Sequence, residues 1–163
     1  MLESDVRLLD ALLDSWQRSN VILTNLLRAV PEGGLDVRGT LDSPSVAQLF
    51  AHMHFVRLVF LAEDAPEFAR PLTEEWVAEK DVPRLVDMLN ESANAVAQAV
   101  RERVETSRPM NMHYDHPILF LQHMIWHEGY HHGQIKLALK GAGLPMNDEA
   151  AGPLTWSVWM KKS

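Results

Sequence analysis

Two histidines four residues apart stand in the segment Trp126-His127-Glu128-Gly129-Tyr130-His131-His132-Gly133-Gln134. The apolar run around them, from about residue 118 to 139, predicts a helix. On a helix, His127 and His131 share one face, one turn apart, so two imidazole nitrogens can reach the same metal ion. Gln134, seven residues after His127, is near that face. One helix cannot complete a metal site, so we expect a further ligand from another element.

His52 is the third imidazole that the sequence offers. It stands in the apolar row of an expected second helix, three residues after Leu49 and four before Val56. A core histidine on its own is usually a hydrogen-bonded structural residue. Three core-facing imidazoles on two helices favour a shared ion, because leaving buried polar rings unpaired costs roughly 1–3 kcal/mol each. The sequence therefore predicts metal binding by His52, His127 and His131.

The other five histidines are weaker candidates for this site. His123, one turn before His127, can extend the stripe. His132 is turned about 100° from its neighbour and should face away. The rest lie off the predicted row or in and beside a loop, where they can line the mouth of a helical bundle: His54, His113 and His116.

Glu128 completes the pattern His127-Glu128-x-x-His131, which zinc metalloproteases use with the glutamate as general base. Such enzymes need a third ligand downstream, and Glu149 is nominally available. Its surroundings read as loop, however, and no strand is predicted that would bind an extended peptide. We therefore expect Glu128 and Gln134 to orient a ligand or a bound water rather than to bind the ion.

Four long amphipathic segments separated by turn signals predict an all-α fold, specifically a four-helix bundle. The expected helices cover residues 4–29, 43–62, 83–104 and 116 to 141 or 143. No segment reads as a strand, and we find no internal repeat or domain boundary. We therefore expect residues 1–163 to form a single domain.

The ends of these helices carry local signals. Ser43 is the expected N-cap of the second helix, with Pro44 at its first position. The connection 63–83 contains three prolines and an expected helical turn around 74–78. The tail, residues 147–163, carries two tryptophans and is expected to pack across one end of the bundle.

Composition limits the partners. The formal net charge of -7 argues against nucleic acid, since phosphate binding is mainly cationic. The chain has no cysteine, so any catalytic thiol must come from a substrate or cofactor. The acidic start is unlike a signal peptide, and no apolar segment reads as long and clean enough to span a bilayer. We expect a cytoplasmic protein without a membrane partner.

Two segments carry a family resemblance. Ser45-Val46-Ala47-Gln48-Leu49-Phe50-Ala51-His52-Met53 resembles the second-helix motif of the DinB/YfiT-like family. Trp126-His127-Glu128-Gly129-Tyr130-His131-His132-Gly133-Gln134-Ile135 resembles its later His-x-x-x-His-x-Gly-Gln motif. The similarity extends through Gly143-Leu144-Pro145 and the tryptophan-bearing tail, so it covers essentially the whole chain.

The resemblance implies a four-helix bundle, often a homodimer, that holds a divalent metal through His52, His127 and His131. Known activities of the family include thiol S-transferases and a mycothiol-dependent isomerase. Three imidazoles leave an open position on the ion, as in catalytic sites. We expect a metal-dependent enzyme acting on a small molecule, with thiol transfer as the first hypothesis. The alternatives are a metal-dependent hydrolase and a non-catalytic, stress-related metal-binding protein.

The identity of the ion and of the thiol stays open at this point. Imidazole ligands suit zinc, nickel, iron and copper. A basic pocket would favour an anionic low-molecular-weight thiol as cofactor. Arg57 and Lys136 are close enough in sequence to the expected ligands to be candidates for such a pocket.

Overall fold

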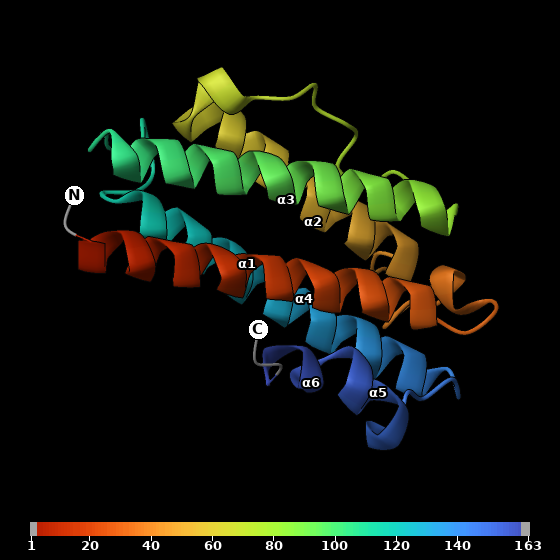
Figure 1. The fold of residues 1–163 in the computed structure, drawn as a ribbon. Helices are drawn as coiled ribbons and strands as arrows, with labels where there is room; N and C mark the ends of the chain where they lie inside the picture. The colour runs from red at the N-terminus through yellow and green to blue at the C-terminus, as the bar shows by residue number, and fades with distance from the viewer. Residues whose placement is uncertain (1–2, 161–163) are drawn as a thin grey trace.

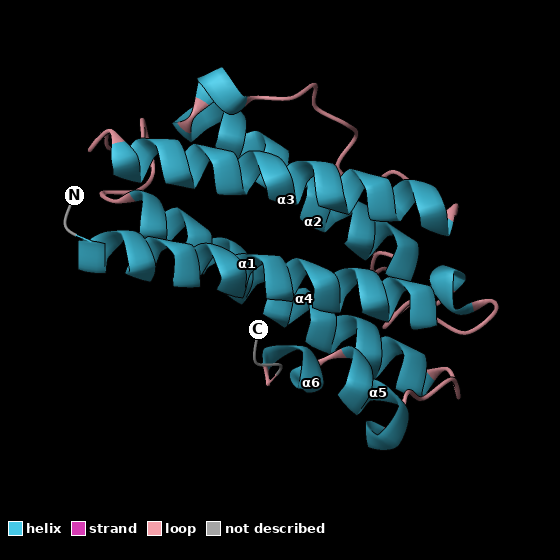
Figure 2. Cartoon of the chain, in the orientation of Figure 1, coloured by secondary structure: helices cyan, strands magenta, loops and turns pink. Residues whose placement is uncertain are grey.

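The computed structural model describes residues 3–160, with side chains from residue 6 onward, and within this range the chain is helical and contains no strand. Four long helices lie side by side, followed by two short ones (Figure 1, Figure 2). Their bounds are α1 (Glu3–Ala29), α2 (Val46–Asp64), α3 (Val82–Glu105), α4 (Pro117–Gly141), α5 (Asp148–Leu154) and α6 (Trp156–Trp159), with 3₁₀ turns η1 (Gly34–Asp36) and η2 (Pro66–Phe68). The all-α prediction is confirmed.

The long helices bury two apolar clusters. One is built from the first half of α1, the end of α2, the second half of α3 and the first half of α4; the other is built from the remaining halves. Representative members are Trp16, Leu61, Val96 and Phe120 in the first, and Leu27, Phe50, Leu89 and Ile135 in the second. Between the two clusters, the buried side chains of Asn20, Arg57, Ser92 and Glu128 form a hydrogen-bonded polar layer.

Arg57 occupies the centre of this polar layer and is fully buried. Its Nε donates to Glu128 Oε1 at 2.6 Å. Its Nη1 donates to Asn20 Oδ1 at 3.0 Å and to the carbonyl oxygen of Leu89 at 2.6 Å. The guanidinium carbon also lies 4.7 Å from the ring centroid of Trp16. One side chain on α2 thus contacts α1, α3 and α4, because a buried charge needs partners on every side that excludes water.

The start of α2 differs from the prediction. Ser45, not Ser43, is the N-cap: its hydroxyl accepts from the backbone N–H of Gln48, and Gln48 Oε1 accepts from the N–H of Ser45 at 3.0 Å. Two orphan donors are satisfied together by this reciprocal pair, which Ser43 cannot match. Ser43 instead accepts from the backbone N–H of Thr40, inside the preceding loop. Pro44 therefore lies outside the helix.

The connections also differ from expectation. The helical turn between α2 and α3 is η2, and the residues around 74–78 form only a simple turn.

The tail packs along the side of α1 rather than across one end (Figure 1). Asn25 donates to the carbonyl of Leu154 at 3.0 Å, and Arg18 Nη1 donates to that of Val158 at 2.7 Å. These side chains on α1 satisfy carbonyl groups that the short terminal helices leave unpaired.

Within residues 3–160, α2 has the length and apolar composition of a membrane span, contrary to the prediction from the sequence. However, 61% of its most apolar window is buried inside the structure. Its buried face also carries Arg57. Core helices meet the same criteria, so this feature is weak evidence for a span.

Candidate metal centre

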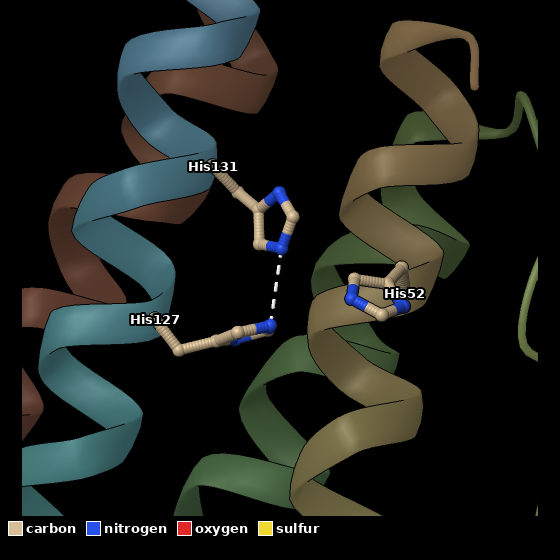
Figure 3. A group of neighbouring side chains, drawn as sticks. All are labelled: His52, His127 and His131. Atoms are coloured by element: carbon tan, nitrogen blue, oxygen red, sulfur yellow. Dashed lines mark hydrogen bonds between the residues drawn. The ribbon is translucent and has the colours of Figure 1, made fainter. Parts of the chain in front are cut away.

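His52, His127 and His131 point toward one another across the contact between α2 and α4 (Figure 3). The Nε2 atoms of His127 and His131 are 3.0 Å apart, and one ring nitrogen from each of the three lies within 4.8 Å of the other two. Two ligands of a tetrahedral zinc ion, each about 2.0–2.1 Å from it, would be about 3.3–3.4 Å apart. The pair on α4 is therefore spaced close to what a shared ion requires.

Gln134 sets the orientation of His131. The Nδ1 of His131 donates to Gln134 Oε1 at 2.7 Å, so in the neutral ring Nε2 keeps its lone pair for the centre. Histidines that bind metals are usually oriented in this way. Without an ion, the lone pair of His131 Nε2 can instead accept a hydrogen bond from the ring of His127. This hydrogen bond gives no role to His52, whereas an ion engages all three rings.

Two residues between η2 and α3 contact His52, and they were not identified from the sequence. The ring of Trp76 stacks on the imidazole, with centroids 4.3 Å apart and planes 3° from parallel. Glu75 Oε1 lies 3.1 Å from His52 Nδ1, where a carboxylate can orient the ring and leave Nε2 for the centre. Gln48 donates to the carbonyl of Trp76 at 2.9 Å and ties this segment to α2.

The three imidazoles are held neutral. Burial is the main cause that lowers the pKa of His127, to about 3, and the neighbouring rings of His131 and His52 lower it further. Burial also lowers the pKa of His52, against the opposing effect of Glu75, and that of His131, against its hydrogen bond to Gln134. Neutral imidazole is the metal-binding form, so these ligands need not lose a proton near neutral pH.

Gln134 and Glu128 were both expected to support the site from α4, but only Gln134 contacts one of the three histidines. Gln134 contacts His131, whereas the carboxylate of Glu128 pairs with Arg57 in the polar layer. Burial raises the pKa of Glu128, and Arg57 opposes that shift. The position of Arg57 also corrects a prediction, because a fully buried guanidinium is not available to an anionic thiol. Lys136 is half-buried on the side of His132.

The remaining histidines are not among the three converging rings, although His123 lies edge-on to His127 with ring centroids 6.5 Å apart. His132 lines a cavity of about 180 Å³ beside Ser19 and Trp159, away from the three converging rings, as its 100° turn predicts. His123 contacts the hydroxyl of Tyr114 at 2.7 Å. His54 is buried between α2 and α3, His113 lies 2.8 Å from Asp64, and His116 caps α4.

Replacing Gln134 with leucine is expected to weaken metal affinity by about 10–100-fold, because the Nδ1 of His131 loses the acceptor that fixes its tautomer. Competition with a chromogenic chelator measures the change. Gln122→Leu is the matched control, since Gln122 is exposed on the same helix. Equal affinities for the wild type and Gln134→Leu would show that His131 does not depend on this contact.

A comparison with protein families bears on the two motifs. The model of the DinB family matches residues 1–150. The chain belongs to the DinB family. The match contains α2 and α4 with all three converging histidines, and the resemblance inferred from the sequence is confirmed. No curated protein and no solved structure matches this DinB-family chain.

The donor set fits a divalent ion. Of the His, Asp and Glu side chains in the described part of the chain, these three histidines form the group able to hold a metal. The three rings are largely buried and neutral, and the ring of His131 is oriented by Gln134. Partial burial of the three rings lowers the local dielectric constant, which strengthens electrostatic interactions at such a site.

Proposed function

We propose that this DinB-family protein is a metal-dependent enzyme that transfers a low-molecular-weight thiol to an electrophilic small molecule. The observation that carries the proposal is the convergence of three neutral imidazoles in a chain without cysteine. His52, His127 and His131 would hold the ion. A divalent ion in this site favours the thiolate form of a thiol near neutral pH, and three protein ligands leave room for it.

The side chains around the site position the histidine rings. Gln134 accepts a hydrogen bond from His131, the carboxylate of Glu75 lies beside His52 Nδ1, and Trp76 covers His52 on one face. In the transfer, the thiol proton goes to solvent and the sulfur lone pair forms a bond to the electrophilic carbon. The leaving group departs with the electron pair of its broken bond. Holding both reactants in one site converts a bimolecular encounter into an oriented one.

The choice of ion follows from the ligands. Imidazoles without thiolate or carboxylate ligands suit zinc, nickel or iron. In the proposed reaction the ion only has to bind a thiolate, and any of these divalent ions can do so. The proposed reaction therefore requires the site rather than one particular metal.

The proposal is tested with a panel of cellular thiols against monochlorobimane and epoxides. Metal-loaded protein should form the conjugates, whereas chelated protein and His131→Ala should not. His132→Ala is the matched control and should keep the activity, since His132 lies away from the centre. Equal rates in loaded, chelated and His131→Ala protein would contradict thiol transfer at this site.

Two outcomes of the same experiment favour the alternatives. Hydrolysis of esters or amides by metal-loaded protein without any thiol would indicate a metal-dependent hydrolase. Tight metal binding without turnover on the whole panel would indicate a non-catalytic metal-binding protein, for instance one that acts under stress.

We further propose that the chain is a single four-helix-bundle domain of the DinB/YfiT-like type. We propose that it acts in the cytoplasm as a homodimer, without nucleic-acid or membrane partners. Leu119, Trp126 and Tyr130 support the dimer, because they are exposed on one face of α4 and the last two rings stack. Light scattering should show a dimer that Trp126→Glu converts to a monomer. A wild-type monomer would contradict the dimer.

A further inference from the structure

A cavity of about 420 Å³ adjoins the candidate metal centre. It lies between the loop that follows η1 and the C-terminal part of α4, which are at the same end of the molecule (Figure 1). The size is in the range of small-molecule binding sites. Its lining includes Arg38, Gly39, Leu49, Gln134, Leu137 and Gly141.

Leu49 and Gln134 line the cavity on the side of the metal centre, although the three histidines themselves do not line it. Leu49 is one turn before His52 on α2, and Gln134 is one turn after His131 on α4. The oxygen of the Gln134 amide is used by His131. Its nitrogen has no hydrogen-bond partner among residues 3–160, so two N–H donors remain for a ligand.

Arg38 gives the cavity its charge. Among the described residues that line it, Arg38 alone is charged, although the chain as a whole is acidic. One N–H of its guanidinium donates to the carbonyl of Ser43, which holds the side chain against the loop. A guanidinium has five N–H donors in a planar fork that suits a carboxylate, so donors are left for an anion. Leu49, Leu137 and Ala138 supply an apolar wall.

We propose that this cavity binds a small organic acid with an apolar body as substrate of the metal centre. Its carboxylate pairs with Arg38, its apolar part lies on Leu49 and Leu137, and its reactive end lies beside Gln134 and the histidines. The assignment rests on the proposed function for the reaction, but the recognition of the carboxylate depends only on this chain's residues. Arg38 is in this account a specificity-determining residue and not a metal ligand.

Two probes that differ in one group test the proposal: 6-mercaptohexanoate, and 6-mercapto-1-hexanol, in which an alcohol replaces the carboxylate. Calorimetry on metal-loaded protein should show about tenfold or stronger preference for the carboxylate, as expected of a charge-assisted hydrogen bond. Arg38→Gln should abolish the preference, and Arg38→Glu should reverse it. Arg28→Gln, at an exposed arginine outside the cavity, should retain it.

Three further measurements separate this inference from the proposed function. Elemental analysis should show the same metal content in the Arg38 variants and the wild type. In chelated protein both probes should bind more weakly, but the carboxylate should still be preferred. NMR shifts on binding should include the side-chain amide of Gln134 and the backbone of Gly39 and Gly141. Equal affinity for the two probes in the wild type, or the same preference in Arg38→Gln, would overturn the inference even if the protein proves to be a thiol transferase.

Discussion

Glu128→Ala is expected to lower the free energy of unfolding by about 3–5 kcal/mol, because it leaves the guanidinium of Arg57 buried without its anionic partner. The pair is separated by 2.6 Å, and the two side chains are 0% and 3% exposed. The remaining acceptors of Arg57 are neutral and cannot balance the charge: Asn20, Ser92 and the carbonyl of Leu89. Urea denaturation with an unchanged m-value measures the loss.

Two variants make this expectation specific. Glu91→Ala removes an exposed carboxylate from α3 and should change stability by about 0.5 kcal/mol or less. Replacing both partners, as in Arg57→Met with Glu128→Leu, should recover most of the loss, because apolar groups of similar volume often substitute for a buried ion pair. A loss below about 1 kcal/mol in Glu128→Ala would mean that Arg57 is compensated elsewhere.

Removing the ion is expected to lower the melting temperature by about 8–16 °C. An ion present at about a thousand times its dissociation constant stabilises the folded state by about 4 kcal/mol, and each kcal/mol shifts a chain of this size by about 2–4 °C. The stabilisation arises because His52 comes from α2 and the other two ligands from α4, so the ion joins two helices. Calorimetry with and without a chelator measures it.

The control for this second prediction is the variant His131→Ala. It should melt at the same temperature with and without chelator, since it has lost a ligand. A wild-type melting temperature that does not respond to a chelator would show that the three histidines hold no ion that contributes to folding. The buried ion pair of Arg57 and Glu128 predicts no such response, so the two stabilising features can be measured separately.

Periodicity was enough to locate the three histidines. His52 is found because it continues the row of Leu49 and Val56, and the pair on α4 is found because four residues make about one helical turn. The long helices are predicted within a few residues for the same reason. Ser45 was missed although Ser45-x-x-Gln48 is a recognisable capping box, because the Ser43-Pro44 pair two residues earlier is also a valid start signal.

Contacts between distant segments were not predictable in this way. The sequence places Arg57 near the expected ligands but does not show that Glu128 faces it across the core. The expectation that Arg57 lines a ligand pocket was therefore wrong. Glu75 and Trp76 lie in an irregular connection, whose path depends on contacts such as that of Gln48 with the Trp76 carbonyl. Arg38 likewise enters a cavity with Gln134 only through the folding of the loop before α2. Local patterns determine faces of helices, but not which loop covers them.

The most direct test of the central claim is elemental analysis of protein purified without an affinity tag and loaded with zinc, nickel or iron. We expect about one divalent ion per chain in the wild type and in His132→Ala, and none in the double variant His127→Ala/His131→Ala or in His52→Ala. Full metal occupancy in the folded double variant would contradict the assignment of His52, His127 and His131 as the metal centre.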